Sequence, residues 1–77
     1  MYEGDAHGWN ALSPAELQVV RLVADGGTNR AIAERLFLSP HTVSSHLRHA
    51  FTKLAITSRV ELTRIVLAHD SARDLGE

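Results

Sequence analysis

The sequence contains no cysteine, so neither disulfide bonds nor a cysteine-based zinc site can stabilise its fold. It also has no apolar run near the roughly 20 residues that a membrane-spanning helix requires. Its first residues lack the basic start and apolar core of a signal peptide. These absences predict a cytoplasmic protein with no membrane partner.

Signatures of catalysis are missing as well. The sequence has no glycine-rich phosphate loop, no convincing nucleophile–base pair and no cluster of metal ligands. Among its five histidines, His46 and His49 would be neighbours on a helix, but no third ligand converges on them. We therefore predict that the protein is not an enzyme and has no catalytic residue, metal or cofactor.

Acidic residues are absent from one long segment, Phe37 to Val60. The whole chain has a net charge of −1, but residues 28–64 carry six basic and two acidic side chains, a net charge of +4. Residues 1–27 and 65–77 carry net charges of −3 and −2. A basic centre between acidic ends is the electrostatic footprint of a nucleic-acid-binding surface, although charge alone does not decide the matter.

The sequence has only two prolines, and each directly follows a serine. Ser13-Pro14-Ala15-Glu16 combines a capping box with proline at the first helical position. The helix that this predicts has Val19, Val20 and Val23 on one face and ends at Gly26-Gly27. Chain length allows one domain.

The middle of the chain predicts two further helices separated by a tight turn. Thr28 can cap a short helix, and Ser39-Pro40 starts a longer one that runs to about Leu54. The apolar face of the short helix contains Ile32, Ala33 and Leu36, and that of the long helix contains Val43, Leu47, Ala50, Phe51 and Leu54. The opposite face of the long helix is polar. This is the plan of a helix-turn-helix, although the turn contains Phe37 and Leu38 where many such motifs have glycine.

Ser58 and Glu61 form another capping box, which predicts a fourth helix with Leu62, Ile65 and Val66 on its inner side. No segment has the pattern of a strand. We therefore predict an all-α, four-helix bundle-like domain over residues 12–69, with a central helix-turn-helix and no wing. Residues 1–11 are predicted to be a linker or flexible segment, apart from Trp9, which should pack on the domain. Residues 70–77 are predicted to be a flexible tail.

The segment from Leu12 to Leu62 resembles the LuxR/FixJ-type (GerE-like) DNA-binding domain. The resemblance covers about two thirds of the chain, in order and without gaps. Its matching pieces are Leu12-Ser13-Pro14, Glu16, Val19-Val20, Gly26, Thr28-Asn29, Ile32-Ala33, Leu36, Ser39, Thr42-Val43, His46, Lys53-Leu54, Ser58-Arg59 and Glu61-Leu62. Proteins of this family often carry the domain at the C-terminus of a larger bacterial transcription regulator.

The resemblance implies that the third helix, about residues 40–54, lies in the major groove of double-stranded DNA and reads its sequence. It places Ser44, Ser45 and Arg48 at positions that reach base edges. It places Thr28, Asn29, Thr42, His46 and Lys53 near phosphates. It also implies a dimer contact through the fourth helix, for which Val60, Arg64 and Leu67 are the candidates. We expect this homodimer to be weak.

The chemistry of the residues adds to these assignments. The guanidinium of Arg48 matches the O6 and N7 acceptors of guanine, although a phosphate contact or a solvated side chain would also explain this residue. Arg30, Lys53 and Arg59 are either solvated charges or phosphate contacts. The helix N-termini at Thr28 and Ser39 expose amides that suit phosphate. His41 and His49 would favour DNA when protonated, and His46 is either packed in the domain, in contact with phosphate, or both.

Two positions depart from the family pattern. Relatives often have basic or amide side chains where this chain has Ser44 and Ser45, which weakens the expected base readout. Relatives usually have glycine where this chain has Ala55, and a left-handed backbone there would strain alanine by roughly 1 kcal/mol.

Two alternatives to a DNA-binding regulator remain at this point. One is a helical protein–protein interaction or dimerisation module that has lost DNA binding, which the acidic total charge and the two serines favour. The other is a domain that recruits RNA polymerase, as in sigma factors of similar fold.

Overall fold

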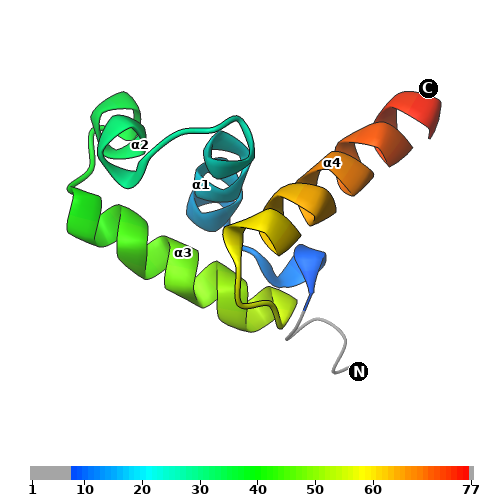
Figure 1. Cartoon of the computed structure of the whole chain (residues 1–77), viewed down its shortest axis with the longest axis horizontal. Helices are drawn as coiled ribbons and strands as arrows, with labels where there is room; N and C mark the ends of the chain where they lie inside the picture. The colour runs from blue at the N-terminus through cyan, green and yellow to red at the C-terminus, as the bar shows by residue number, and fades with distance from the viewer. Residues whose placement is uncertain (1–7, 77) are drawn as a thin grey trace.

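The computed structural model describes residues 8–76, and the side chains of residues 8–70. It contains a 3-10 turn, η2 (Trp9–Ala11), and the helices α1 (Pro14–Ala24), α2 (Asn29–Leu36), α3 (Pro40–Leu54) and α4 (Arg59–Gly76) (Figure 1). The described residues form no strand. The predicted all-α architecture with four helices is therefore confirmed.

Side chains that cap the helix N-termini set where the helices begin. Ser13 accepts a hydrogen bond from the Glu16 amide at 3.1 Å, and Glu16 accepts one from the Ser13 amide at 2.9 Å, so the predicted capping box forms. Thr28 and Ser39 accept from the amides three residues later, each at 3.1 Å. Each such cap contributes about 1 kcal/mol, which explains why α1, α2 and α3 begin at the predicted residues.

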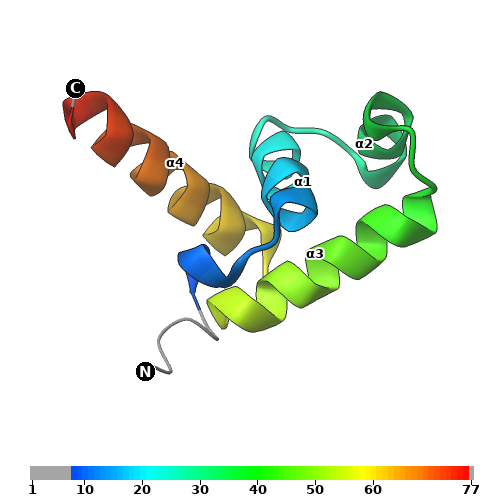
Figure 2. The same ribbon diagram turned by 180° about the vertical axis from the view of Figure 1, so that it is seen from behind.

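The hydrophobic core lies around α1, which packs against α2, α3 and α4. Its buried members are Val19, Val20, Val23, Ile32, Ala33, Val43, Leu47, Ala50, Leu62 and Val66. All of them were predicted from helical spacing. Figures 1 and 2 show that α3 runs along one edge of the molecule, with α1 and α2 on its inner side. The core therefore anchors one face of α3 and leaves the other outside.

Between residues 8 and 76, two residues other than glycine have left-handed backbone, and each ends a helix. Phe37 (φ 60°) follows α2 in the turn of the helix-turn-helix, and its side chain is 94% exposed. Ala55 (φ 57°) follows α3, at the position where the family resemblance predicted strain. Left-handed backbone costs L-residues other than glycine roughly 1–2 kcal/mol, so both helix ends are strained.

Helical residues are described on both sides of the predicted domain of residues 12–69. Trp9, inside the predicted linker, lies in η2 and stacks on His69 of α4, with ring centroids 4.1 Å apart. This confirms that Trp9 packs on the domain. At the other end, α4 continues past residue 69 as far as Gly76, and Asp70 pairs with Arg21 of α1 at 2.6 Å. Trp9 and Asp70 therefore contact the four-helix domain from outside residues 12–69.

None of the helices in residues 8–76 is long and apolar enough to cross a membrane.

Candidate nucleic-acid interface

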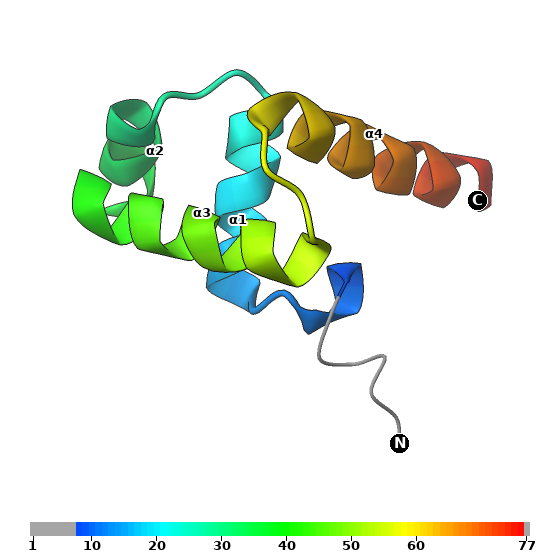
Figure 3. The same cartoon turned by 60° about the horizontal axis from the view of Figure 1, so that its bottom comes forward.

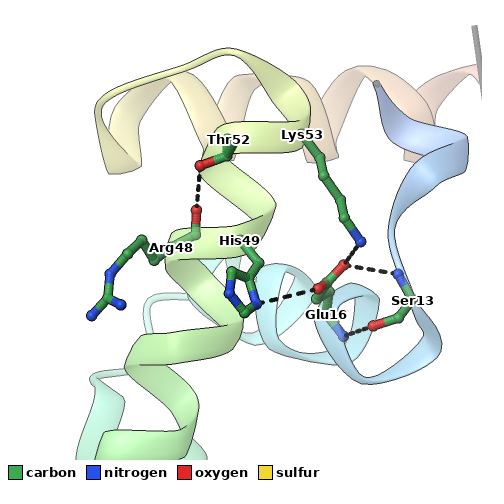
Figure 4. Close-up of polar contacts among 6 residues, drawn as sticks. All are labelled: Ser13, Glu16, Arg48, His49, Thr52 and Lys53. Atoms are coloured by element: carbon green, nitrogen blue, oxygen red, sulfur yellow. Dashed lines mark hydrogen bonds and ion pairs between the residues drawn. The ribbon is translucent and has the colours of Figure 1, made fainter. Parts of the chain in front are cut away.

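The outer face of α3 is the surface on which the predicted base-contacting residues lie. Arg48, His41 and His49 are exposed, and Ser44 and Ser45 are half-buried. Figure 3 shows α3 in front of α1, with no other helix over its outer side. The Arg48 side chain extends away from α1 (Figure 4), and no ion pair of Arg48 occurs among the described residues. The described part of the chain therefore leaves this face accessible to a partner.

The inner border of α3 is fixed by a buried carboxylate. Glu16 of α1 is 5% exposed, and its Oε1 accepts a hydrogen bond from Lys53 Nζ at 2.7 Å (Figure 4). His49 Nδ1 lies 3.9 Å from the other carboxylate oxygen. Burial acts to raise the pKa of Glu16, but hydrogen bonds from Lys53 and the Ser13 amide, together with the charge of Lys53, outweigh it and hold the pKa below its ordinary value. Lys53 thus ties the last turn of α3 to the start of α1.

A second polar connection joins α2, α3 and α4. Asn29 Nδ2, at the first residue of α2, donates to Ser44 Oγ on α3 at 3.0 Å. Arg59, at the first residue of α4, donates from Nη1 to Asn29 Oδ1 at 3.4 Å and from Nη2 to the Gly27 carbonyl oxygen at 3.1 Å. These three side chains, predicted separately as base or phosphate contacts, therefore form one connected group.

The N-termini of α2 and α3 carry the remaining polar candidates. Thr28 and Ser39 are exposed caps, and Ser39 shares a hydrogen bond with Thr42 at 2.9 Å between their hydroxyl oxygens. Arg30 is 87% exposed, and its pair with Glu34 at 3.9 Å is a weak, solvated contact. His46 is half-buried at the border between the core and the outer face of α3. Both helix ends thus present backbone amides and hydroxyl groups to solvent.

A family model for bacterial regulatory proteins of the luxR family matches residues 10–66. The chain belongs to this family. Its helix-turn-helix is α2, the turn at Phe37 and Leu38, and α3. Family membership and this geometry together support DNA binding by a transcription regulator.

Relatives of this luxR-family domain share its sequence over most of the chain. A helix-turn-helix transcriptional regulator of Mycobacterium bovis is 54% identical over 57 residues, which are 74% of this chain and 6% of that protein. The oxygen regulatory protein NreC of Staphylococcus aureus is 45% identical over 56 residues, which are 73% of this chain and 26% of NreC. The chain therefore spans only a small part of the length of these relatives.

A solved structure of the Salmonella typhimurium response regulator RcsB contains the same fold. The match has a TM-score of 0.71 at 35% identity and covers 74% of this chain and 27% of RcsB. The luxR-family fold predicted from the sequence is therefore confirmed.

Sequence reasoning missed the long-range partners of four candidate site residues in this luxR-family domain. Lys53 was predicted as a phosphate contact, yet its ammonium bonds Glu16. One signal was available, because Glu16 lies three and four residues before Val19 and Val20, on the stripe that the core buries. A carboxylate on a buried stripe needs a basic partner. No comparable signal pointed to the contacts of Asn29 with Ser44 and Arg59.

Proposed function

We propose that this luxR-family domain binds double-stranded DNA in a sequence-specific way, with the outer face of α3 in the major groove. The observation that carries the proposal is the asymmetry of α3. Val43, Leu47 and Ala50 bury one face in the core, while the face around Arg48 is exposed and free of acidic residues. The major groove of B-DNA is wide enough for an α-helix.

In this arrangement Arg48 is the principal base contact. Its guanidinium is exposed on the outer face and can bond O6 and N7 of one guanine, which discriminates against other bases by about 1–3 kcal/mol. Ser44 and Ser45 lie beside it and supply single hydrogen bonds. Readout therefore centres on one strong contact with two weaker ones beside it.

The phosphate contacts lie at the N-termini of α2 and α3. The hydroxyl groups of the exposed caps Thr28 and Ser39, and that of the half-buried Thr42, lie at these N-termini and suit phosphate oxygens. Arg30 and His41 are exposed, and His46 lies at the edge of the same face. We assign Lys53, Asn29 and Arg59 first to holding the helices in register, because each bonds another part of the domain.

A weak homodimer through α4 is the second part of the proposal. Val60 and Leu67 are 63% and 56% exposed, and Arg64 between them is also exposed. Spacings of four and three residues place all three on one side of the helix. A dimer formed there would present two α3 helices to half-sites about one turn of DNA apart.

The domain is also proposed to act as the DNA-binding part of a larger regulator, because the relatives extend far beyond the matched segment.

Titration of random duplex DNA across a salt series, followed by selection of bound sequences from a random pool, tests the DNA-binding proposal. We expect affinity to fall steeply with salt, because each neutralised phosphate releases counterions, and we expect one motif to be enriched. Salt-independent binding or no binding would instead favour a protein-interaction module.

A further inference from the structure

Ser44 is the one predicted base-contacting residue whose side chain is held by other parts of the domain. Its hydroxyl oxygen accepts a hydrogen bond from Asn29 Nδ2 at 3.0 Å. Asn29 is in turn bonded by Arg59, which also donates to the Gly27 carbonyl oxygen. We call this series of contacts the Arg59–Asn29–Ser44 relay.

The relay has a fixed direction. A guanidinium can only donate, so Arg59 must face the oxygen of the Asn29 amide. The nitrogen of that amide then faces Ser44. The Arg59 guanidinium therefore determines which of its two flipped orientations the Asn29 amide adopts. A hydroxyl that accepts from Asn29 keeps its own proton turned away from Asn29. Among the described residues no acceptor is bonded to that proton.

We propose that Asn29, oriented by Arg59, occupies one of the two acceptor sites of the Ser44 oxygen and turns the Ser44 proton outward, so that Ser44 acts mainly as a hydrogen-bond donor toward DNA and favours base pairs that present an acceptor. This inference rests on the proposed function. In the major groove, guanine N7 and O6, adenine N7 and thymine O4 are acceptors, whereas cytosine presents only an amino donor. Ser44 therefore disfavours cytosine at the position it contacts. A free serine hydroxyl would donate or accept equally well and would discriminate little.

Replacement of Asn29 by aspartate should reverse the direction of the hydrogen bond between residue 29 and Ser44. A carboxylate accepts from both Arg59 and Ser44, so the Ser44 proton turns inward and a lone pair faces the groove. Aspartate is also well tolerated in the first turn of a helix. We expect wild-type protein to disfavour cytosine at one position by about threefold to tenfold, the usual worth of one hydrogen bond. Asn29→Asp should favour cytosine or adenine at that same position.

The experiment is selection of bound duplexes from random DNA with the full chain, carried out for wild type, Asn29→Asp, Ser44→Ala and Thr28→Asp. Thr28→Asp is the matched control, because it adds the same charge at the adjoining residue and keeps a good N-cap. It should weaken binding to all sequences without altering base preference. Ser44→Ala should abolish the preference at the Ser44 position and leave the others unchanged.

The proposal is overturned if Ser44→Ala selects the wild-type motif, or if Asn29→Asp binds DNA but keeps the wild-type preference at that position. Alanine is a good helix former, so the Ser44→Ala result stands even if Asn29→Asp fails to fold. Binding of the wild type to random duplex DNA across the salt series distinguishes failure of the relay from failure of the proposed function. Salt-dependent binding with an unchanged motif refutes only the relay, whereas loss of salt-dependent binding in the wild type refutes the proposed function and the relay together.

Discussion

The Glu16 carboxylate lies 2.7 Å from the Lys53 ammonium, so the N-terminus of α1 and the last turn of α3 share one buried anion. The same carboxylate accepts from the Ser13 amide. One side chain therefore caps the first helix and holds the end of the proposed recognition helix. The orientation of α3 is linked to the ionisation of Glu16.

Stability should consequently depend on pH through Glu16. Its pKa in the folded protein lies below the ordinary value of 4.5. A lowered folded-state pKa means that the stabilisation is complete above about pH 4.5 and is lost as the pH falls through the lower value. Glu16→Gln should lower the free energy of unfolding at neutral pH by about 1–2 kcal/mol and flatten the acid side of the profile. Urea unfolding from neutral to acid pH measures both effects.

The control for this titration is Glu34→Gln, which removes an exposed carboxylate that pairs with Arg30 at 3.9 Å. An exposed pair of this kind contributes less than about 1 kcal/mol. An acid profile that changes equally in the two variants would remove Glu16 as the cause.

The assignment of Lys53 to positioning predicts how salt affects DNA binding. If the ammonium is neutralised by Glu16, Lys53→Gln should lower stability but change the salt slope only slightly. Arg30→Gln, which removes an 87% exposed guanidinium, should reduce the slope by about one unit. Random-duplex titrations over a range of salt concentrations compare the two variants. A larger reduction of the salt slope in Lys53→Gln than in Arg30→Gln would instead identify Lys53 as a phosphate contact.

Patterns local in sequence predicted most of the fold. Serine or threonine before each of α1, α2 and α3 sets the starts, and valines three and four residues apart identify the buried face of α1. Contacts between residues far apart along the chain left no such pattern. Trp9 was expected to pack, but its partner His69 is 60 residues away, and Asp70 falls in a charged stretch without apolar periodicity. The contacts of Asn29 with Ser44 and Arg59 were missed for the same reason.

The two left-handed residues predict sites where glycine should stabilise the protein. Phe37→Gly and Ala55→Gly should each raise the free energy of unfolding by up to about 1 kcal/mol, because glycine adopts this backbone without steric cost. Phe37 is 94% exposed and loses little packing on substitution. Thermal and urea unfolding measure the gain. Ala31→Gly, at an exposed helical position of α2, should instead destabilise by about 1 kcal/mol.

Arg48→Ala should relax sequence selection at one base pair. Loss of a bidentate contact to guanine corresponds to about 1–3 kcal/mol of discrimination, while preferences at the other positions should persist. Selection from random DNA, followed by titration of the single-base variants of the motif, measures this. Arg35→Ala removes the same side chain from an exposed position on α2 and should leave the motif unchanged. A motif that is equally affected by both substitutions would contradict base readout by Arg48.

The proposed α4 dimer predicts that affinity depends on the number of half-sites. Leu67→Glu places a charge on the side of α4 that carries Val60 and Arg64, and burial of that charge in an apolar contact is costly. The variant should bind a single half-site like the wild type but lose the added affinity of a two-half-site duplex. Gln18→Glu adds the same charge at an exposed position of α1, and this variant should retain the added affinity for the two-half-site duplex. Each half-site contact is unchanged in Leu67→Glu, so a loss of affinity confined to the two-half-site duplex would identify α4 as the dimer contact. A wild-type protein that stays monomeric on that duplex would contradict the proposed dimer.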